Sequence, residues 1–173
     1  DIDSTNGLVQ LSMFQYYIKK GLFDLGFNAL SIVMSSVEVD QQLKQEILLQ
    51  ITYDKSIPFS IHQVEKLCIQ FLASFPKNHD ILVLLSDLSF IQMKEDTACS
   101  LLREALSINP TSYKLWGQLI GSTMTRGLYK ESLKDAENAI LYHPNQPFPY
   151  LAKGIIYNMQ NKWDDALLIL KQG

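Results

Sequence analysis

Three prolines divide the second half of this chain at a fixed interval. Pro76, Pro110 and Pro144 follow one another at spacings of 34 residues. Before each proline lies a run of apolar or small residues at positions i, i+4 and i+7, a spacing that puts them on one face of a helix. Proline cannot continue a helix, so each proline is predicted to end one helix of a repeated unit. The runs are Val64, Cys68 and Phe71, then Ala98, Leu102 and Ala105, then Ser132, Ala136 and Ala139.

The residues between these prolines resemble the tetratricopeptide repeat. That repeat has a 34-residue period with the pattern W-x2-L-G-x2-Y, then A-x3-F, then P. The last segment reads Tyr150-x2-Lys153-Gly154-x2-Tyr157 and then Ala166-x3-Leu170. The unit before it has Trp116-x2-Leu119, Ala139 and Pro144, and the one before that has Leu82-x2-Leu85, Ala98-x3-Leu102 and Pro110.

The resemblance implies an all-α fold, a right-handed superhelical solenoid of about five helix pairs. It predicts one repeat domain over residues 1–173, with units at about 7–40, 41–78, 79–112, 113–146 and 147–173. The pattern is specific over 79–173 and looser over 7–78. Because a final unit normally needs a polar cap, the domain is expected to be a segment of a longer protein.

Two irregularities are expected in the first half of the chain. Pro58 interrupts a helical pattern, which predicts a longer loop at residues 55–60. Four extra residues, about 41–44, are predicted to separate the first unit from the second. Gly21 and Gly127 are predicted to lie at the turns inside helix pairs, and Gly26 and Gly154 at close contacts between helices.

Composition excludes several classes of protein. Hydrophobic residues make up 47% and charged residues 19% of the chain, which favours a folded, soluble domain. A net charge of −3 argues against nucleic acid as a partner. Apolar stretches are too short for direct membrane insertion. The compartment is unknown: a cytoplasmic location is preferred, and a periplasmic one stays open if a signal was removed upstream.

No motif for catalysis or cofactor binding stands out. Cys68 and Cys99 lack the paired spacing of a zinc site and are predicted to be inert buried thiols. The three histidines, His62, His79 and His143, do not form a metal-binding pair on a helix. Acidic pairs such as Glu95-Asp96 and Asp164-Asp165 are predicted to face helix dipoles at helix starts. The chain is therefore not expected to be an enzyme, and no cofactor or metal is predicted.

The resemblance also implies where a partner binds. In the tetratricopeptide family the first helix of each unit lines a concave groove. Lys114 is the only cation at the positions of the family's lysine–asparagine clamp, so the expected ligand is an apolar protein or peptide segment. Carried onto this chain, the groove positions are Asp80, Val83, Asp87 and Phe90; Lys114, Gly117, Gly121 and Met124; and Phe148, Leu151, Ile155 and Asn158.

Three functional hypotheses follow. The first is a protein–protein interaction scaffold that binds its partner in this groove. The second is a substrate-positioning or regulatory module of a larger enzyme whose catalytic domain lies outside this segment. The third is an architectural repeat that associates with itself, for which the uncapped C-terminal end is the expected surface. An alternative reading of Phe148, Leu151 and Ile155 is that they contact a further unit of a longer array.

Overall fold

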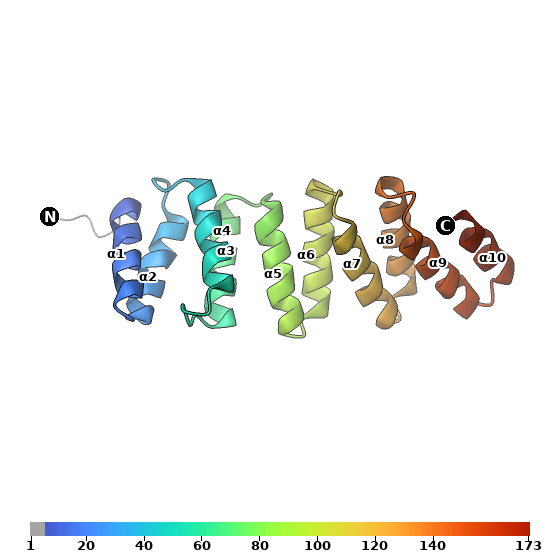
Figure 1. The fold of residues 1–173 in the computed structure, drawn as a ribbon, viewed down its shortest axis with the longest axis horizontal. Coiled ribbons are helices and arrows are strands. Elements are labelled where there is room, and N and C mark those ends of the chain that lie inside the picture. The colour runs from blue at the N-terminus through green and yellow to red at the C-terminus, as the bar shows by residue number, and fades with distance from the viewer. Residues whose placement is uncertain (1–5) are drawn as a thin grey trace. The chain divides into compact units, whose positions relative to one another are not determined.

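The computed structural model describes residues 6–173, in which the helices are joined by turns and loops and there is no β-strand (Figure 1). The predicted all-α class is confirmed. The contacts divide the chain into two compact units, residues 1–88 and 89–173. The helices are α1 (Gly7–Lys19), α2 (Phe23–Ser35), α3 (Gln41–Tyr53), α4 (Ile61–Ser74), α5 (His79–Ile91), α6 (Glu95–Ile108), α7 (Tyr113–Thr125), α8 (Tyr129–Tyr142), α9 (Pro147–Met159) and α10 (Trp163–Gln172).

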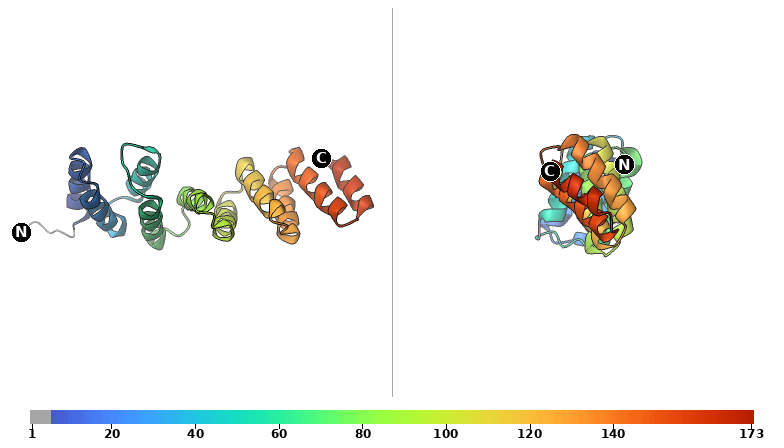
Figure 2. Two further views of the ribbon diagram at one scale, coloured as in Figure 1. Left: turned by 90° about the horizontal axis from the view of Figure 1, so that it is seen from below. Right: turned by 90° about the vertical axis from the view of Figure 1, so that its right-hand side faces the viewer.

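The turn inside a helix pair has the same backbone conformation four times. Gly21, Met93, Gly127 and Asn161 have left-handed φ angles of 71°, 59°, 73° and 58°. Each lies two residues after one helix and two before the next. In the α7–α8 turn, the Leu128 N–H donates to the Thr123 carbonyl oxygen at 2.9 Å, the long bond of a Schellman motif. This turn folds the second helix back beside the first, as α9 and α10 show in Figures 1 and 2.

The three periodic prolines follow the second helices of their pairs. Helices α4, α6 and α8 end two residues before Pro76, Pro110 and Pro144 respectively. The residue before each proline still donates its N–H to the carbonyl four residues back, as His143 does to Ala139 at 2.8 Å. Proline has no N–H to extend this ladder, so the helix stops there. The prediction from the proline spacing is confirmed.

The predicted spacer at residues 41–44 is wrong, because these residues form the first turn of α3. The Asp40 carboxylate caps this turn by accepting from the Gln42 N–H at 2.7 Å. Lys44 is 1% exposed, and its Nζ donates to the Met34 carbonyl at 3.2 Å and to the Ser36 carbonyl. These carbonyls lie at the C-terminal end of α2, where the helix dipole stabilises a positive charge. A lysine is rarely buried, so nothing in the local sequence indicated this burial.

A loop joins α3 to α4, as Pro58 predicted. It occupies residues 54–60, with Ile57 buried inside it. The Ser60 hydroxyl accepts from the Gln63 N–H at 3.3 Å, and the Gln63 side chain accepts from the Ser60 N–H at 2.9 Å. This reciprocal capping box fixes the start of α4 after the loop.

Each unit has its own apolar core. In the first unit the side chains of Leu30, Met34, Leu48, Leu67 and Phe71 are fully buried. In the second unit small residues share the core with large ones, and the fully buried set includes Leu102, Ala105, Leu119, Ile120, Ala136, Ala139 and Ile156. Small side chains let neighbouring helices approach closely, while the large ones fill the space between them.

Candidate functional site: two faces of the helix pairs

Two of the three predicted groove rows lie together in the second unit. One is on α7, the other on α9, and equivalent members are 34 residues apart. The two helices pack against each other, so the rows form one surface, here called the A-helix face. None of these eight residues is buried. The A-helix face consists of Lys114, Gly117, Gly121 and Met124 on α7 and Phe148, Leu151, Ile155 and Asn158 on α9.

The two glycines leave the α7 half of this face without side chains. A Cβ atom added at Gly117 or Gly121 would meet no atom within 4 Å. Gly154 is different, since a Cβ there would lie 2.6 Å from the Leu170 side chain. Glycine inside a helix costs roughly 0.5–1 kcal/mol relative to alanine. Packing explains that cost at Gly154, as predicted, but no contact inside the described chain requires glycine at 117 or 121.

The α9 half of the face presents apolar side chains to solvent. Leu151 is 48% exposed and Ile155 is 37% exposed, and they lie four residues apart on the same side of the helix. Phe148 is half-buried and Asn158 is exposed. The A-helix face thus combines a bare strip of α7 backbone with an exposed apolar strip on α9.

The remaining predicted row lies on α5. Asp80, Val83 and Asp87 belong to the first unit, and Phe90 belongs to the second. Gln45 on α3 donates to the Asp80 carboxylate at 2.7 Å and accepts from the Asn78 side-chain amide at 2.7 Å. Asp80 therefore contributes to the contact between α3 and α5 within the first unit.

A pocket that was not predicted from the sequence lies between the second helices of the pairs. This B-helix pocket has a volume of about 520 Å³ and lies between α6 and α8, with Trp116 of α7 in its wall. Its centre is an ion pair: Arg103 Nε and Nη2 donate to the two Asp135 carboxylate oxygens at 3.1 and 2.7 Å. The lining residues are Arg103, Leu106, Ser107, Trp116, Glu131, Lys134, Asp135, Asn138 and Tyr142.

The two partners of this ion pair differ in how far their side chains are buried. The Asp135 side chain is 4% exposed, whereas that of Arg103 is 40% exposed. The hydrogen bonds that Arg103 donates to Asp135 raise the pKa of Arg103 above its ordinary value, so the guanidinium stays charged. One signal in the sequence pointed to this pair. Asp135 interrupts the stripe of small residues formed by Ser132, Ala136 and Ala139, where a carboxylate needs a buried partner.

Solved structures with a similar backbone identify the fold. A crystal structure of MamA protein has a TM-score of 0.60 and 14% sequence identity, covering 96% of this chain and 88% of that chain. YrrB, described as a TPR protein with an unusual peptide-binding site, has a TM-score of 0.58 and 10% identity, covering 98% of this chain and 86% of its own. The chain has the tetratricopeptide-repeat fold. No family model matches the sequence, and no curated protein matches it either.

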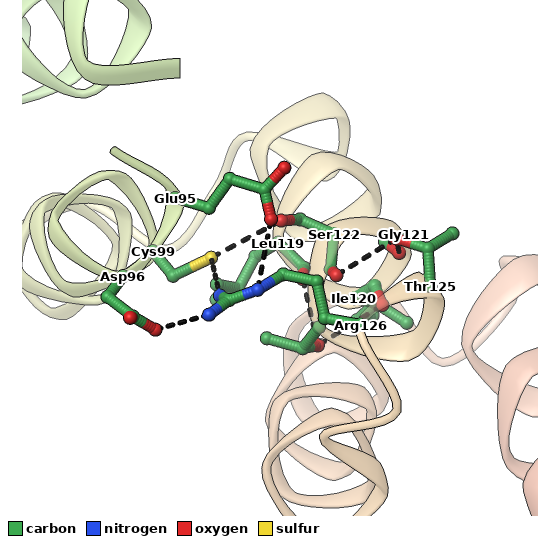
Figure 3. Close-up of polar contacts among 10 residues, drawn as sticks. Glu95, Asp96, Cys99, Leu119, Ile120, Gly121, Ser122, Thr125 and Arg126 are labelled. Atoms are coloured by element: carbon green, nitrogen blue, oxygen red, sulfur yellow. Dashed lines mark hydrogen bonds and ion pairs between the residues drawn. The ribbon is translucent and has the colours of Figure 1, made fainter. Parts of the chain in front are cut away.

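A second charged cluster joins α6 and α7 of the tetratricopeptide-repeat fold (Figure 3). Arg126, directly after α7, reaches the first turn of α6, where its Nε lies 3.0 Å from Glu95 Oε2 and its Nη2 donates to Asp96. Arg126 Nη1 also donates to Cys99 Sγ at 4.0 Å, and Cys99 Sγ donates to Ser122 Oγ at 3.5 Å. The hydrogen bond that Arg126 donates to Asp96 is the main reason that the pKa of Arg126 is raised. The acidic pair is at the helix start, as predicted, but its arginine partner was missed.

The two cysteine thiols lie where the sequence indicated. Cys68 and Cys99 are both buried, and neither forms a disulfide. Burial is the main cause that raises the pKa of Cys68 to about 12, so its thiol is protonated at neutral pH. His62 is exposed and lies 3.5 Å from the Glu65 carboxylate in the same helix. Within residues 6–173, no group of three or more His, Cys, Asp or Glu side chains is arranged to hold a metal ion.

The helices of this tetratricopeptide-repeat fold are short. Across the part of the chain that the structure describes, none combines the length and apolar character that crossing a bilayer requires.

Proposed function

We propose that this chain is a protein-interaction scaffold and that the A-helix face binds an apolar segment of a partner protein or peptide. The observation that carries the proposal is the pair Gly117 and Gly121, whose missing side chains are not explained by packing inside the chain. Two glycines in one helix together cost roughly 1–2 kcal/mol. A bare helix surface lets another backbone approach closely, which offsets this cost when a partner is bound.

The chemistry of the neighbouring row suggests the kind of partner. Leu151 and Ile155 offer exposed apolar area beside the glycines, and Lys114 is the one basic residue in the two rows. Burying such side chains releases roughly 25 cal/mol per Å² of apolar surface. An amphipathic helix or an extended apolar segment suits this face better than a strongly acidic peptide. That YrrB is described as having a peptide-binding site is consistent with this use of the fold.

The glycines allow a test in which loss of binding is not loss of folding. Peptides would first be selected on the intact protein from a displayed random library. We expect Gly117→Leu and Gly121→Leu to weaken their binding at least about tenfold, because leucine fills the open strip. The same substitutions should leave stability unchanged or raise it by up to about 1 kcal/mol each, since leucine favours the helix.

Further variants complete the test. Lys114→Glu and Leu151→Asp should also weaken binding while the circular-dichroism spectrum stays helical. Lys130→Leu is the matched control, since it places leucine at an exposed position on α8 instead. Selected peptides that bind all four groove variants as tightly as the wild type would show that this face is not the site.

An architectural role through self-association is a second candidate, favoured by one observation on α10. Four large apolar side chains of this helix are exposed: Trp163, Leu167, Leu168 and Leu170. Sedimentation velocity over a range of concentrations is expected to show a dimer that the double change Leu167→Glu, Leu168→Glu dissociates. Leu141→Glu, at an exposed position on α8, is the control. A wild-type protein that sediments as a monomer throughout would rule this role out.

A further inference from the structure

The B-helix pocket has a counterpart one repeat later in the second unit. A pocket of about 300 Å³ between α8 and α10 is lined at equivalent positions, each 34 residues on. Leu106 corresponds to Ile140, and Trp116 corresponds to Tyr150. The central pair differs, because Arg103 corresponds to Glu137 and Asp135 corresponds to Ile169. The repeat therefore provides an internal comparison for the ion pair.

This comparison indicates that an arginine–aspartate pair at these two positions is not needed to pack one helix pair on the next, since Glu137 instead pairs with Lys153 Nζ at 3.0 Å. An apolar side chain, Ile169, occupies the position equivalent to the buried carboxylate of Asp135. Replacing a buried ion pair with apolar residues is often neutral or stabilising, since burying charge has a large desolvation cost. The chain nevertheless keeps a buried carboxylate and an arginine between α6 and α8. A role beyond stability would explain why.

The ion pair holds a guanidinium in a fixed orientation at the pocket surface. Asp135 engages Nε and one Nη2 hydrogen of Arg103 in a bidentate pair. An arginine has five N–H donors, so three are left over. Within the described residues no other hydrogen bond to this side chain is found, and 40% of it is exposed. A planar donor group held in this way is suited to bind a carboxylate.

Along α8 the pocket changes from charged to aromatic. Glu131 and Lys134 lie at the charged end, where their opposite charges offset each other. At the other end the Tyr142 ring stacks on Trp116, with centroids 6.3 Å apart and an interplanar angle of 14°. Tyr142 is 55% exposed, so one ring face is available. Asp135 and Tyr142 are separated by roughly 10 Å along the helix, the length of about three extended residues.

We propose that the B-helix pocket binds an extended peptide that carries a carboxylate about three residues from an aromatic or large aliphatic side chain. The carboxylate accepts hydrogen bonds from the free edge of Arg103. The apolar side chain packs on Tyr142 and Leu106. The Asn138 amide lies between them on α8, where it faces the peptide backbone. This site is separate from the A-helix face, so it neither requires nor tests the function proposed above.

The probe is a pool of synthetic peptides of the form Ac-Phe-Ser-Gly-Asp-NH2, with phenylalanine, leucine or tryptophan at the first position. Titration is followed by nitrogen–proton correlation spectra of the intact, isotope-labelled chain. We expect saturable shifts at the Trp116 indole, the Asn138 side-chain amide and residues of α6 and α8. The matched peptides with Asn in place of Asp should bind at least about fivefold more weakly, because the charge-assisted hydrogen bonds are lost.

Two variants distinguish binding from folding. Arg103→Lys keeps the positive charge but loses the planar set of N–H donors that Asp135 holds in place. It should weaken binding several-fold. The double change Arg103→Leu, Asp135→Leu replaces the ion pair with apolar side chains, as Ile169 replaces the buried carboxylate in the neighbouring pocket, so it should fold normally and lose the peptide. Glu137→Gln, at the equivalent position one repeat on, is the control and should bind like the wild type. The proposal is overturned by shifts confined to α7 and α9, by no saturable shift, by equal binding of Asp and Asn peptides, or by binding that survives the double change.

Discussion

The indole N–H of Trp116 donates to the carbonyl oxygen of Pro110 over 2.9 Å. One repeat later, the Tyr150 hydroxyl donates to the carbonyl oxygen of Pro144, also over 2.9 Å. In both repeats the aromatic residue six positions after the proline donates to the carbonyl oxygen of that proline. This hydrogen bond links the loop between two helix pairs to the first helix of the following pair. Leu82, the equivalent residue after Pro76, has no side-chain donor. The aromatic at this repeat position therefore acts through its polar atom as well as its area.

The hydrogen bond of Tyr150 predicts a measurable loss of stability when it is removed. Tyr150→Phe keeps the ring and should lower the free energy of unfolding by about 1 kcal/mol, the net value of one such bond. Denaturation with urea measures this change. Tyr129→Phe removes a hydroxyl for which the described residues provide no hydrogen bond, and it should change stability by less than about 0.5 kcal/mol. Equal effects of the two substitutions would contradict the assignment.

The left-handed turn residues predict two substitutions of opposite sign. Met93 has φ 59° and is 83% exposed, so Met93→Gly relieves backbone strain and loses little burial. We expect it to stabilise the chain by about 0.5–1 kcal/mol. Gly127→Ala introduces the same strain at φ 73° without a clash and should destabilise by about 1 kcal/mol. Thermal unfolding of both variants checks the signs, and a lower midpoint for Met93→Gly would contradict the strain argument.

Lys44 predicts a dependence of stability on alkaline pH. Desolvation is the main cause that lowers its pKa in the folded state, with Asp40 opposing it. Between this lowered pKa and the unfolded value of about 10.4, the unfolded chain binds more protons. The free energy of unfolding should therefore rise with pH in this window, relative to Lys44→Met, in which nothing titrates at that position. Parallel curves of stability against pH for the two proteins would exclude the lowered pKa.

Lys44→Ala tests the packing role of the same side chain. It removes the donor to the Met34 and Ser36 carbonyls and leaves a cavity where the buried stem lay. We expect a loss of about 2–4 kcal/mol in unfolding free energy, measured with urea. Lys55→Ala, in the exposed part of the α3–α4 loop, should change stability by less than about 0.5 kcal/mol. A loss below about 1 kcal/mol at Lys44 would mean that water replaces the ammonium at low cost.

Cys68 predicts an unreactive thiol in the folded chain. Its pKa is raised to about 12 and its side chain is fully buried, so almost no thiolate is present near pH 8. A disulfide reagent added to the native Cys99→Ala variant should release no chromophore until denaturant is added. Rapid reaction of the native variant would contradict this burial.

Local patterns were enough to predict most of the helix pairs. The prolines end α4, α6 and α8, and Gly21 and Gly127 take left-handed turns. All of these features depend on a residue's own backbone preference or on its neighbours one turn away. Lys44 shows the limit, because its partners are carbonyls at the end of another helix, which no pattern around residue 44 reveals.

The period and the helix ends follow from residue spacing and backbone chemistry, so they could be predicted from the amino-acid sequence. Which polar groups meet depends on how the helices pack. Arg103 and Asp135 are far apart in the chain, and their pairing depends on how α8 packs beside α6. The structure also decided that Gly117 and Gly121 have open space, whereas Gly154 does not. A glycine looks the same in sequence in both situations, since the difference lies in the atoms that surround it.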